Sequence, residues 1–452
     1  MKSPERRPRS ASLPVFDDTL DAEDNSESED SDQLVEDYGV YGHDGPRPLV
    51  RPDYYEVSVL LCVLVGFSVC FFVLINAAVQ HSDYQAGATY RYRRNVNATL
   101  GYEKKPNRIL VCTLSTVAMQ YPRDGLCDVI VLTHVLYDSQ TGSLHPHRAS
   151  DNGLSTFLRH ARFMTRTRLL PSHDWIALVK AIDARYARGL YRALELLKLK
   201  GLALFNVHVS VEQLPGLIDA LRLLHKEDPR MFLALGAMFE GISDEKASGF
   251  LPSDLFDQLV TPLRLFVLET HLPVPSQHCY TGLSAPLDSY GNTRQTFTLK
   301  GAESLLAHRA LAYVNTTVLV RCISALSGAL VFDVPLQSPE PGAPCLGWST
   351  RKLSEVCRVP TIRHHMDAQS AYGHTDSTFF SFDSTKNMME KVGAVLQRVL
   401  DTDSPACLAV YGLDLDDMRF SCPRMFERSA LLVYTARDVL SSLKERKLGA
   451  AK

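Results

Sequence analysis

The chain has 452 residues, and its 48 lysines and arginines nearly balance its 51 aspartates and glutamates, which leaves a formal net charge of −3. A balance this close to neutral excludes a protein that binds nucleic acid through an overall basic surface. Hydrophobic residues make up 45% of the chain, which is enough to bury a large core, so we expect at least one sizeable folded domain.

Residues 1–52 are predicted to form a disordered acidic tail. The stretch 17–37 is rich in Asp, Glu and Ser, and such a segment buries too little apolar surface to offset the entropy of ordering. Residues 9–14 (RSASLP) have the R-S-x-S-x-P pattern of phosphoserine sites that 14-3-3 proteins bind. Phosphorylated Ser12 would present a dianion to an arginine cluster; an unmodified, solvated tail is the alternative.

An uncharged apolar run follows at 57–79 (VSVLLCVLVGFSVCFFVLINAAV). At about 1.5 Å per residue, such a helix spans the hydrocarbon core of a bilayer. A secretory signal peptide has a shorter apolar region that lies nearer the N-terminus. The sequence therefore predicts one transmembrane helix and a membrane protein.

The orientation of this helix is predicted from the residues on its two sides. Within 15 residues, two arginines precede the run and three come after it, which by itself favours the large domain on the cytosolic side. Eight cysteines and the glycosylation sequons at Asn97 and Asn315 are all C-terminal to the run, and these features are typical of an oxidising, extracellular compartment. We therefore expect a single-pass type II protein of the cell membrane with an extracellular ectodomain.

Residues 80–107 are interpreted as a juxtamembrane stalk. Residues 91–94 (RYRR) fit the R-x-[KR]-R pattern of furin-like proteases, and cleavage after Arg94 would shed the ectodomain. The alternative is a basic cluster that lies near lipid headgroups.

From residue 108 onwards, short apolar segments alternate with amphipathic ones. Predicted strands are 109–114, 129–135, 202–209, 231–235, 265–269, 329–334 and 408–413, and predicted helices are 174–199, 214–224 and 386–400. This alternation predicts a parallel sheet with both faces covered, and seven or eight β/α units suit a (β/α)8 TIM barrel with insertions over 108–446. A doubly wound open sheet is the alternative. The chain contains neither a G-x-G-x-x-G nor a P-loop pattern, and none of its cysteines forms a C-x-x-C pair, so we predict no cofactor and no metal site.

Four segments carry a resemblance to a known family. The segment 408–422 (LAVYGLDLDDMRFSC) resembles the last barrel strand of glycoside hydrolase family 18, the chitinases and chitinase-like proteins. Segments 127–130 (CDVI), 354–357 (SEVC) and 379–383 (FFSFD), the last followed by a helix containing Lys386, resemble other parts of that family. The resemblance covers about residues 108–430 and implies a TIM barrel with disulfides Cys112–Cys127 and Cys357–Cys422.

The strand that carries catalysis in this family departs from the family pattern. Segment 201–210 (GLALFNVHVS) aligns with G-[FY]-D-G-x-D-x-D-W-E, so Ala203, Asn206 and His208 replace the three aspartates and Ser210 replaces the catalytic glutamate. Family members use the glutamate as general acid while an aspartate orients the substrate's acetamido group. A serine hydroxyl has no pKa in the range that general acid catalysis needs, so the resemblance implies an inactive barrel.

Other positions near the expected strand ends are candidates for ligand binding. The family's floor tryptophan aligns with Tyr411, and its M-x-Y-D segment falls near Glu269 and His271. Barrel proteins place their chemistry at such strand ends. The candidate ligand-binding residues are Tyr411, Glu269, His271, His208 and Glu212. Asp414, Asp416 and Asp417 are interpreted as a structural signature, with metal binding as the alternative.

The sequence thus predicts a membrane-tethered, chitinase-like ectodomain that is catalytically inactive and binds a glycan or a protein. The alternative is a divergent active hydrolase of chitin-type or related amino-sugar glycans that uses Glu212, His208 or Glu269. A third interpretation is a signalling adaptor whose phosphorylatable tail is the regulated part.

Overall fold

The computed structural model describes most of the chain from residue 108 onwards, within one compact unit, Glu103–Lys452. The described residues are 108–118, 120–148, 151–239, 253–273, 278–290, 297–307, 319–335, 339–357, 362–400, 406–417, 422 and 432–443. Within this part, no helix combines the length and the hydrophobicity needed to cross a bilayer. The predicted tail, transmembrane helix and stalk lie outside it.

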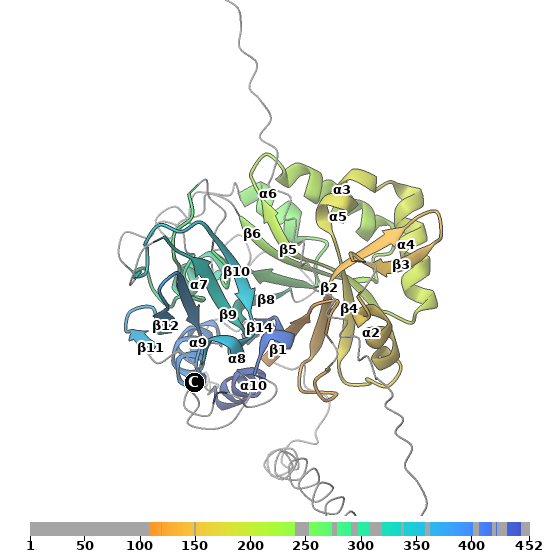
Figure 1. Cartoon of the computed structure of the whole chain (residues 1–452). Helices are drawn as coiled ribbons and strands as arrows, with labels where there is room; N and C mark the ends of the chain where they lie inside the picture. Colours follow the sequence, from red (N-terminus) through yellow and green to blue (C-terminus); the bar gives the residue numbers. More distant parts are fainter. Residues whose placement is uncertain are drawn as a thin grey trace, which may run out of the picture. The chain divides into compact units, whose positions relative to one another are not determined.

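The described part contains a closed barrel of eight parallel strands (Figure 1). The strands are β1 (Arg108–Leu114), β2 (Val129–Asp138), β4 (Arg168–His173), β5 (Gly201–Val209), β6 (Phe232–Phe239), β7 (Leu265–Leu268), β8 (Val320–Leu326) and β14 (Ala406–Tyr411). Strand β1 pairs with both β2 and β14, which closes the ring. This closure confirms the predicted TIM barrel and excludes an open sheet. A short strand, β3 (Ser143–Pro146), pairs antiparallel with β2.

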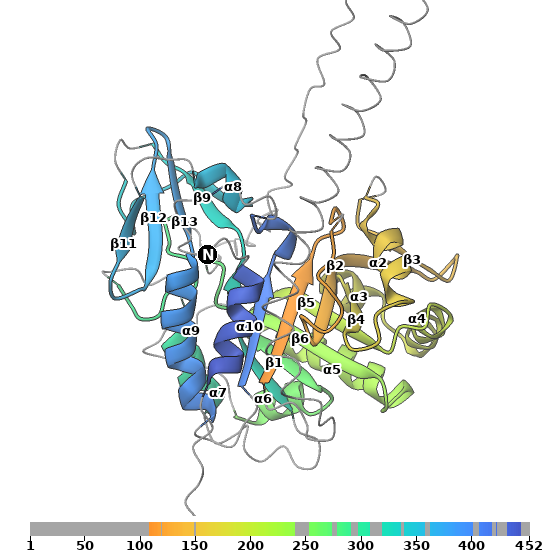
Figure 2. The ribbon, with the colours of Figure 1, turned by 90° about the horizontal axis from the view of Figure 1, so that it is seen from below.

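Helices pack on the outer surface of the barrel. They are α2 (Gly153–Ala161), α3 (Trp175–Ala181), α4 (Ala184–Leu196), α5 (Leu214–Glu227), α6 (Ser253–Val260), α7 (Leu299–Ala307), α9 (Thr385–Leu400) and α10 (Leu432–Ser442). Helices α3, α4 and α5 lie outside the strands in Figure 1, and α9 and α10 lie side by side in Figure 2.

The single helix predicted at 174–199 is two helices. The side chain of Asp174 accepts a hydrogen bond from the backbone N–H of Ala177 and begins α3. Asp183 accepts from the N–H groups of Arg185 and Tyr186 and begins α4. A second N-cap within the same amphipathic pattern ends one helix and starts another, because the capping residue is itself extended.

Alternation along the strands divides the core into two clusters. On β5, Ala203 and Phe205 belong to a cluster that fills the barrel interior, whereas Leu202 and Leu204 belong to the cluster between strands and helices. Both strand faces are therefore buried, as expected for a parallel sheet covered by helices.

A second sheet is inserted between β8 and α9. Its five antiparallel strands are β9 (Ala329–Asp333), β10 (Gly347–Arg351), β11 (Ile362–His365), β12 (Ser370–His374) and β13 (Thr378–Phe382), in the order β10-β9-β13-β12-β11. A single helical turn, α8 (Leu353–Val356), follows β10. The strand predicted at 329–334 belongs to this sheet and not to the barrel. Barrel strands β4 and β8 were not predicted, because Pro171 and Arg321 interrupt their apolar patterns.

A buried ion pair joins this sheet to helix α9. Lys391 lies 2.5 Å from Asp383 and donates to the carbonyl oxygens of Ser284 and Ala285, both at 2.8 Å. The helix that the resemblance placed after 379–383 also contains Lys386, but that side chain is exposed, whereas Lys391 is completely buried.

Four disulfides stabilise the described part. Both bridges that the resemblance implied, Cys112–Cys127 and Cys357–Cys422, are present. Two more were not predicted. Cys279–Cys345 ties the segment after β7 to the segment before β10, and Cys322–Cys407 joins the neighbouring strands β8 and β14.

Candidate functional site

A cluster of polar and aromatic side chains lies at the carboxyl ends of the barrel strands. It comprises Asn206 and His208 of β5, Glu269 and His271 directly after β7, and Tyr411 at the end of β14. We call these five residues the barrel mouth. TIM-barrel proteins place their chemistry at this end.

Three of the four degenerate catalytic positions lie on β5, and the fourth directly follows it. The register with β6 shifts between Leu204 and Val207, and Asn206 in this bulge has a φ of 58°. Ala203 is completely buried in the barrel interior, where its methyl group carries no charge. Ser210 follows the strand and is partly exposed.

Two predicted candidates near the end of β5 differ in their surroundings. Nε2 of His208 is buried and has no hydrogen-bond partner among the described residues. Burial lowers the pKa of this histidine, which favours the neutral ring. Glu212 is exposed beyond the strand, and the structure gives it no contact with the barrel mouth. The two side chains are therefore not brought together.

Glu269 is the centre of the barrel mouth. Its Oε1 accepts a hydrogen bond from the backbone N–H of Asn206 at 2.8 Å and another from the hydroxyl of Tyr411 at 2.7 Å. The side chain is 0% exposed, and burial raises its pKa to about 7 although both hydrogen bonds act in the opposite direction. One carboxyl oxygen thus connects three strands that are far apart in the sequence.

Aromatic rings pack around this carboxyl. The ring of Tyr411 stacks on His271, with centroids 3.8 Å apart, and on Phe205 at 5.6 Å. Nδ1 of His271 lies 3.0 Å from the hydroxyl oxygen of Ser324 on β8. Burial, with a smaller effect of His208, lowers the pKa of His271 to about 3, so this ring is neutral.

Gly236 on β6 makes room for this arrangement. A Cβ at this position would lie 2.5 Å from the hydroxyl oxygen of Tyr411 and 2.6 Å from Oε1 of Glu269. The sequence patterns had singled out neither Gly236 nor Ser324. The Gly and Ser within apolar strands were the available signals, since small or polar residues there mark a close approach of other groups.

Each of the three aspartates after β14 accepts at least one hydrogen bond from a backbone N–H group. Asp414 accepts hydrogen bonds from the backbone N–H and the hydroxyl of Ser115, and Asp417 accepts from the N–H of Cys422. Asp416 accepts hydrogen bonds from the backbone N–H groups of Leu432 and Val433 at the start of α10. Among the described residues no group of three or more His, Cys, Asp or Glu side chains is placed to hold a metal ion. These contacts favour the structural interpretation of the cluster.

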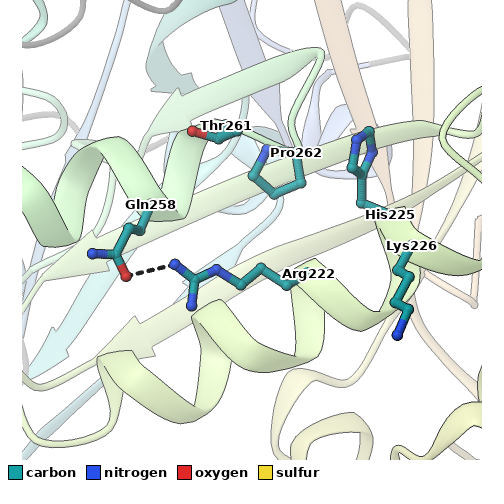
Figure 3. A pocket seen from close by; sticks show the side chains of 6 residues that line it. All are labelled: Arg222, His225, Lys226, Gln258, Thr261 and Pro262. Atoms are coloured by element: carbon teal, nitrogen blue, oxygen red, sulfur yellow. Dashed lines mark hydrogen bonds between the residues drawn. The ribbon is translucent and has the colours of Figure 1, made fainter.

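A pocket of about 190 Å³ lies between the last turns of α5 and α6, away from the barrel mouth (Figure 3). It is lined by Arg222, His225, Lys226, Gln258, Thr261 and Pro262. Arg222 already donates to Gln258 at 2.6 Å and lies 3.6 Å from Asp219. His225 and Lys226 point in opposite directions in Figure 3, so the basic groups do not converge on a common ligand.

The remaining predicted sites lie outside the described residues. They are the sequons at Asn97 and Asn315, the phosphorylation site Ser12 and the cleavage site Arg94.

Comparisons with known proteins identify the fold. No protein-family model and no curated protein sequence matches this chain. Among solved structures, a Group IV chitinase of Ostrinia furnacalis is 14% identical over 74% of this chain and 100% of the chitinase, with a TM-score of 0.54. The human pseudo-chitinase YKL-39, described as retaining chitooligosaccharide binding, is 13% identical over 74% of this chain and 100% of its own, with a TM-score of 0.57. A chitinase-like agglutinin from Robinia pseudoacacia is 12% identical over 73% of this chain and 99% of the agglutinin, with a TM-score of 0.52.

At this level of identity the likeness establishes the fold, and it confirms the resemblance to the chitinases that the sequence predicted. A chitinase, a pseudo-chitinase and an agglutinin share this fold. The function of this chain therefore depends on its own site residues.

Proposed function

Because the chain has the chitinase fold without the residues that perform chitinase chemistry, we propose that it is a non-hydrolytic, chitinase-like binding protein. Its ligand is a glycan of the chitooligosaccharide type or a protein. The barrel is the binding module, and the residues before it attach it to a membrane.

The observation that carries this proposal is the combination of a degenerate β5 with the hydrogen bonds of the barrel mouth. In the alignment with the family, Ser210 replaces the general acid, and Asn206 stands where the family has an aspartate. Tyr411 directs its hydroxyl to Glu269 instead of towards solvent. Hydrolysis of a glycosidic bond needs a positioned acid and a positioned base or nucleophile, and β5 supplies neither.

Two structural neighbours illustrate that this fold is used for binding. The pseudo-chitinase retains chitooligosaccharide binding according to its description, and the chitinase-like protein from Robinia pseudoacacia is named an agglutinin. Their properties support a binding role here by analogy only.

The test is to incubate the full chain, purified in detergent, with fluorogenic chitooligosaccharides and to measure its retention on chitin and on a glycan array. We expect retention without turnover. Turnover that His208→Ala or Glu212→Gln abolishes would overturn the proposal. Absence of both turnover and retention would exclude the glycan and leave a protein ligand, to be sought by cross-linking on cells.

One observation favours the alternative of an active enzyme. Glu269 is a barrel-mouth carboxyl whose pKa lies near 7, in the range that suits a general acid. Its complete burial and its two hydrogen bonds argue against direct contact with a substrate. Any turnover that Glu269→Gln removes while chitin retention persists would establish the alternative.

Membrane attachment is part of the proposal and rests on the apolar run 57–79. In the type II orientation, Asn97 and Asn315 would carry N-glycans, and a tag before residue 50 would be cytosolic. Glycosidase digestion should therefore reduce the apparent mass of the protein made in mammalian cells. The double variant Asn97→Gln with Asn315→Gln should abolish that reduction. A C-terminus that extracellular protease cannot reach on intact cells, together with a protein that carries no glycan, would contradict this topology.

Two regulatory steps outside the barrel are proposed from sequence alone. Phosphorylated Ser12 would bind a 14-3-3 protein, and cleavage after Arg94 would release the ectodomain. Ser12→Ala should abolish capture by 14-3-3, and Arg94→Ala should abolish any soluble form in the culture medium. All four described disulfides lie after Arg94, so none of them would hold a cleaved ectodomain to the span.

A further inference from the structure

The carboxyl of Glu269 connects strands β5, β7 and β14 through a single oxygen. Oε1 accepts hydrogen bonds from the backbone N–H of Asn206 and from the hydroxyl of Tyr411. Oε2, in contrast, is buried without a hydrogen-bond partner among the described residues. This pattern fits a neutral carboxylic acid, in which Oε1 is the carbonyl oxygen and Oε2 carries the proton. An ionised carboxylate would leave Oε2 charged and unsolvated, which is costly in a protein interior.

The groups around Glu269 provide no compensating positive charge. From β5, His208 has its pKa lowered by burial; after β7, His271 is neutral; and at the end of β14, Tyr411 has its pKa raised by burial and by Glu269. The neighbouring positions on β6 and β8 are Gly236 and Ser324, which do not ionise. No lysine or arginine of the described residues bonds to the carboxyl.

We propose that Glu269 is a protonation switch of the barrel mouth: its neutral carboxyl holds β5, β7 and β14 together, and its ionisation opens the mouth to water and to ligand. The ligand step rests on the proposed function, whereas the opening step depends only on the bonds of Glu269. Once the mouth is open, water satisfies Oε2 and the carboxyl regains an ordinary acidity.

The direction of the pH dependence is set by linkage. The closed mouth binds the proton more tightly than the open one, so raising the pH favours opening. Between the ordinary pKa of 4.5 that the carboxyl has in the open mouth and its pKa of about 7 in the closed mouth, the ratio of open to closed molecules should rise by up to about tenfold per pH unit. Above pH 7 both states are ionised and the ratio should level off. At acidic pH the mouth stays closed and ligand binding is weak.

The amide of Asn206 reports this opening without any ligand, because its N–H bonds directly to Glu269. We would measure hydrogen exchange of the full chain in detergent micelles by mass spectrometry between about pH 5 and 8.5. Peptides from β1 (Arg108–Leu114) serve as the reference for the intrinsic pH dependence of exchange. Relative to that reference, exchange of the Asn206 peptide should accelerate by up to about tenfold per pH unit below pH 7 and should follow the reference above pH 7. Parallel rates in both peptides over the whole range would overturn the switch.

Three variants make the test specific. Glu269→Gln, which cannot ionise, should remove the extra pH dependence, and Glu195→Gln, at an exposed position on α4, should retain it. Tyr411→Phe removes a donor that stabilises the ionised carboxyl, so its transition should move to higher pH even if the Gln variant does not fold. An unmoved transition in Tyr411→Phe would contradict the assignment to Glu269.

Binding of chitooligosaccharides at both ends of this pH range separates the switch from the proposed function. Stronger binding at high pH in the native chain, with binding independent of pH in Glu269→Gln, supports both. A pH-dependent Asn206 exchange without any glycan or protein ligand would overturn the proposed function and uphold the switch.

Discussion

Gly236 shows how one residue without a side chain determines the structure of the barrel mouth. Because a Cβ there would collide with both Tyr411 and Glu269, Gly236→Ala should lower the free energy of unfolding by about 1–3 kcal/mol. It should also weaken the bond between Tyr411 and Glu269. Denaturant titration measures the first effect, and hydrogen exchange of Asn206 measures the second.

Gly393 in helix α9 is the matched control. Its nearest neighbour to an added Cβ is Val439 at 3.8 Å, an ordinary contact. Gly393→Ala should therefore stabilise the chain by up to about 1 kcal/mol through helix propensity. Equal effects at the two glycines would refute the steric argument.

The buried pair of Lys391 and Asp383 yields a second residue-scale prediction. Both side chains are 0% exposed, and removing one partner leaves an uncompensated buried charge. Lys391→Met should destabilise the protein by about 3–5 kcal/mol, whereas Lys386→Met, on an exposed turn of the same helix, should change stability by under about 0.5 kcal/mol. Comparable losses in the two variants would contradict the argument that burial of the Lys391 charge causes the loss.

At the scale of elements, the break between α3 and α4 depends on one cap. Asp183→Ala removes the acceptor for two N–H groups at the start of α4 and should cost about 1 kcal/mol of stability. Asn152, the N-cap of α2, makes no side-chain capping bond, so Asn152→Ala should have a smaller effect. The urea midpoints of unfolding of the two variants measure this difference. A larger loss of stability in Asn152→Ala than in Asp183→Ala would contradict the role of the Asp183 cap.

The bulge in β5 is the other element that matters for function. A regular strand would alternate side chains strictly between the barrel interior and the helices. The bulge instead turns the Asn206 N–H towards Glu269 while Val207 and Val209 stay in the outer core. A local change of register therefore converts a strand backbone into part of the site.

At the scale of the whole molecule, buried acids should make stability fall as the pH rises through neutrality. Burial raises the pKa of Glu269 from 4.5 to about 7 and that of Asp416 from 3.8 to about 7. The stability that such groups contribute is fully present below their ordinary pKa and is lost as the pH rises through 7. Buried His271, with its pKa lowered from 6.5 to about 3, acts oppositely and costs stability as the pH falls below 6.5.

Above about pH 6.5 the unfolded histidine is largely neutral, so the two acids dominate and stability should fall as the pH rises towards 8. Between about pH 8 and 6.5 the free energy of unfolding should rise by about 1–2 kcal/mol, as measured by urea unfolding with the disulfides intact. The double variant Glu269→Gln with Asp416→Asn should flatten this slope. A native chain that is most stable at pH 8 would contradict the assignment of these carboxyls as neutral.

The sequence by itself determined the alternation of strands and helices, because strand and helix periodicities and turn signals are local properties of the chain; only the pairing of β1 with both β2 and β14 excluded an open sheet. It also determined which chemistry is absent: Ala203 and Ser210 cannot act as the acids they replace, wherever they lie. The segment 408–422 led to the correct fold because its aspartates are each required by a separate backbone contact.

The tertiary structure alone decided what the site contains instead. Asn206, Gly236, Glu269, Ser324 and Tyr411 come from five strands spread over more than 200 residues, and no local pattern shows that they meet. Glu269 and His271 were predicted as candidate ligand-binding residues, and only the structure shows that both are buried, because the depth of a side chain depends on what the other strands place above it. The neutral state of Glu269 likewise results from burial and from the absence of a neighbouring cation among the described residues, which are properties of the closed barrel and not of the local sequence.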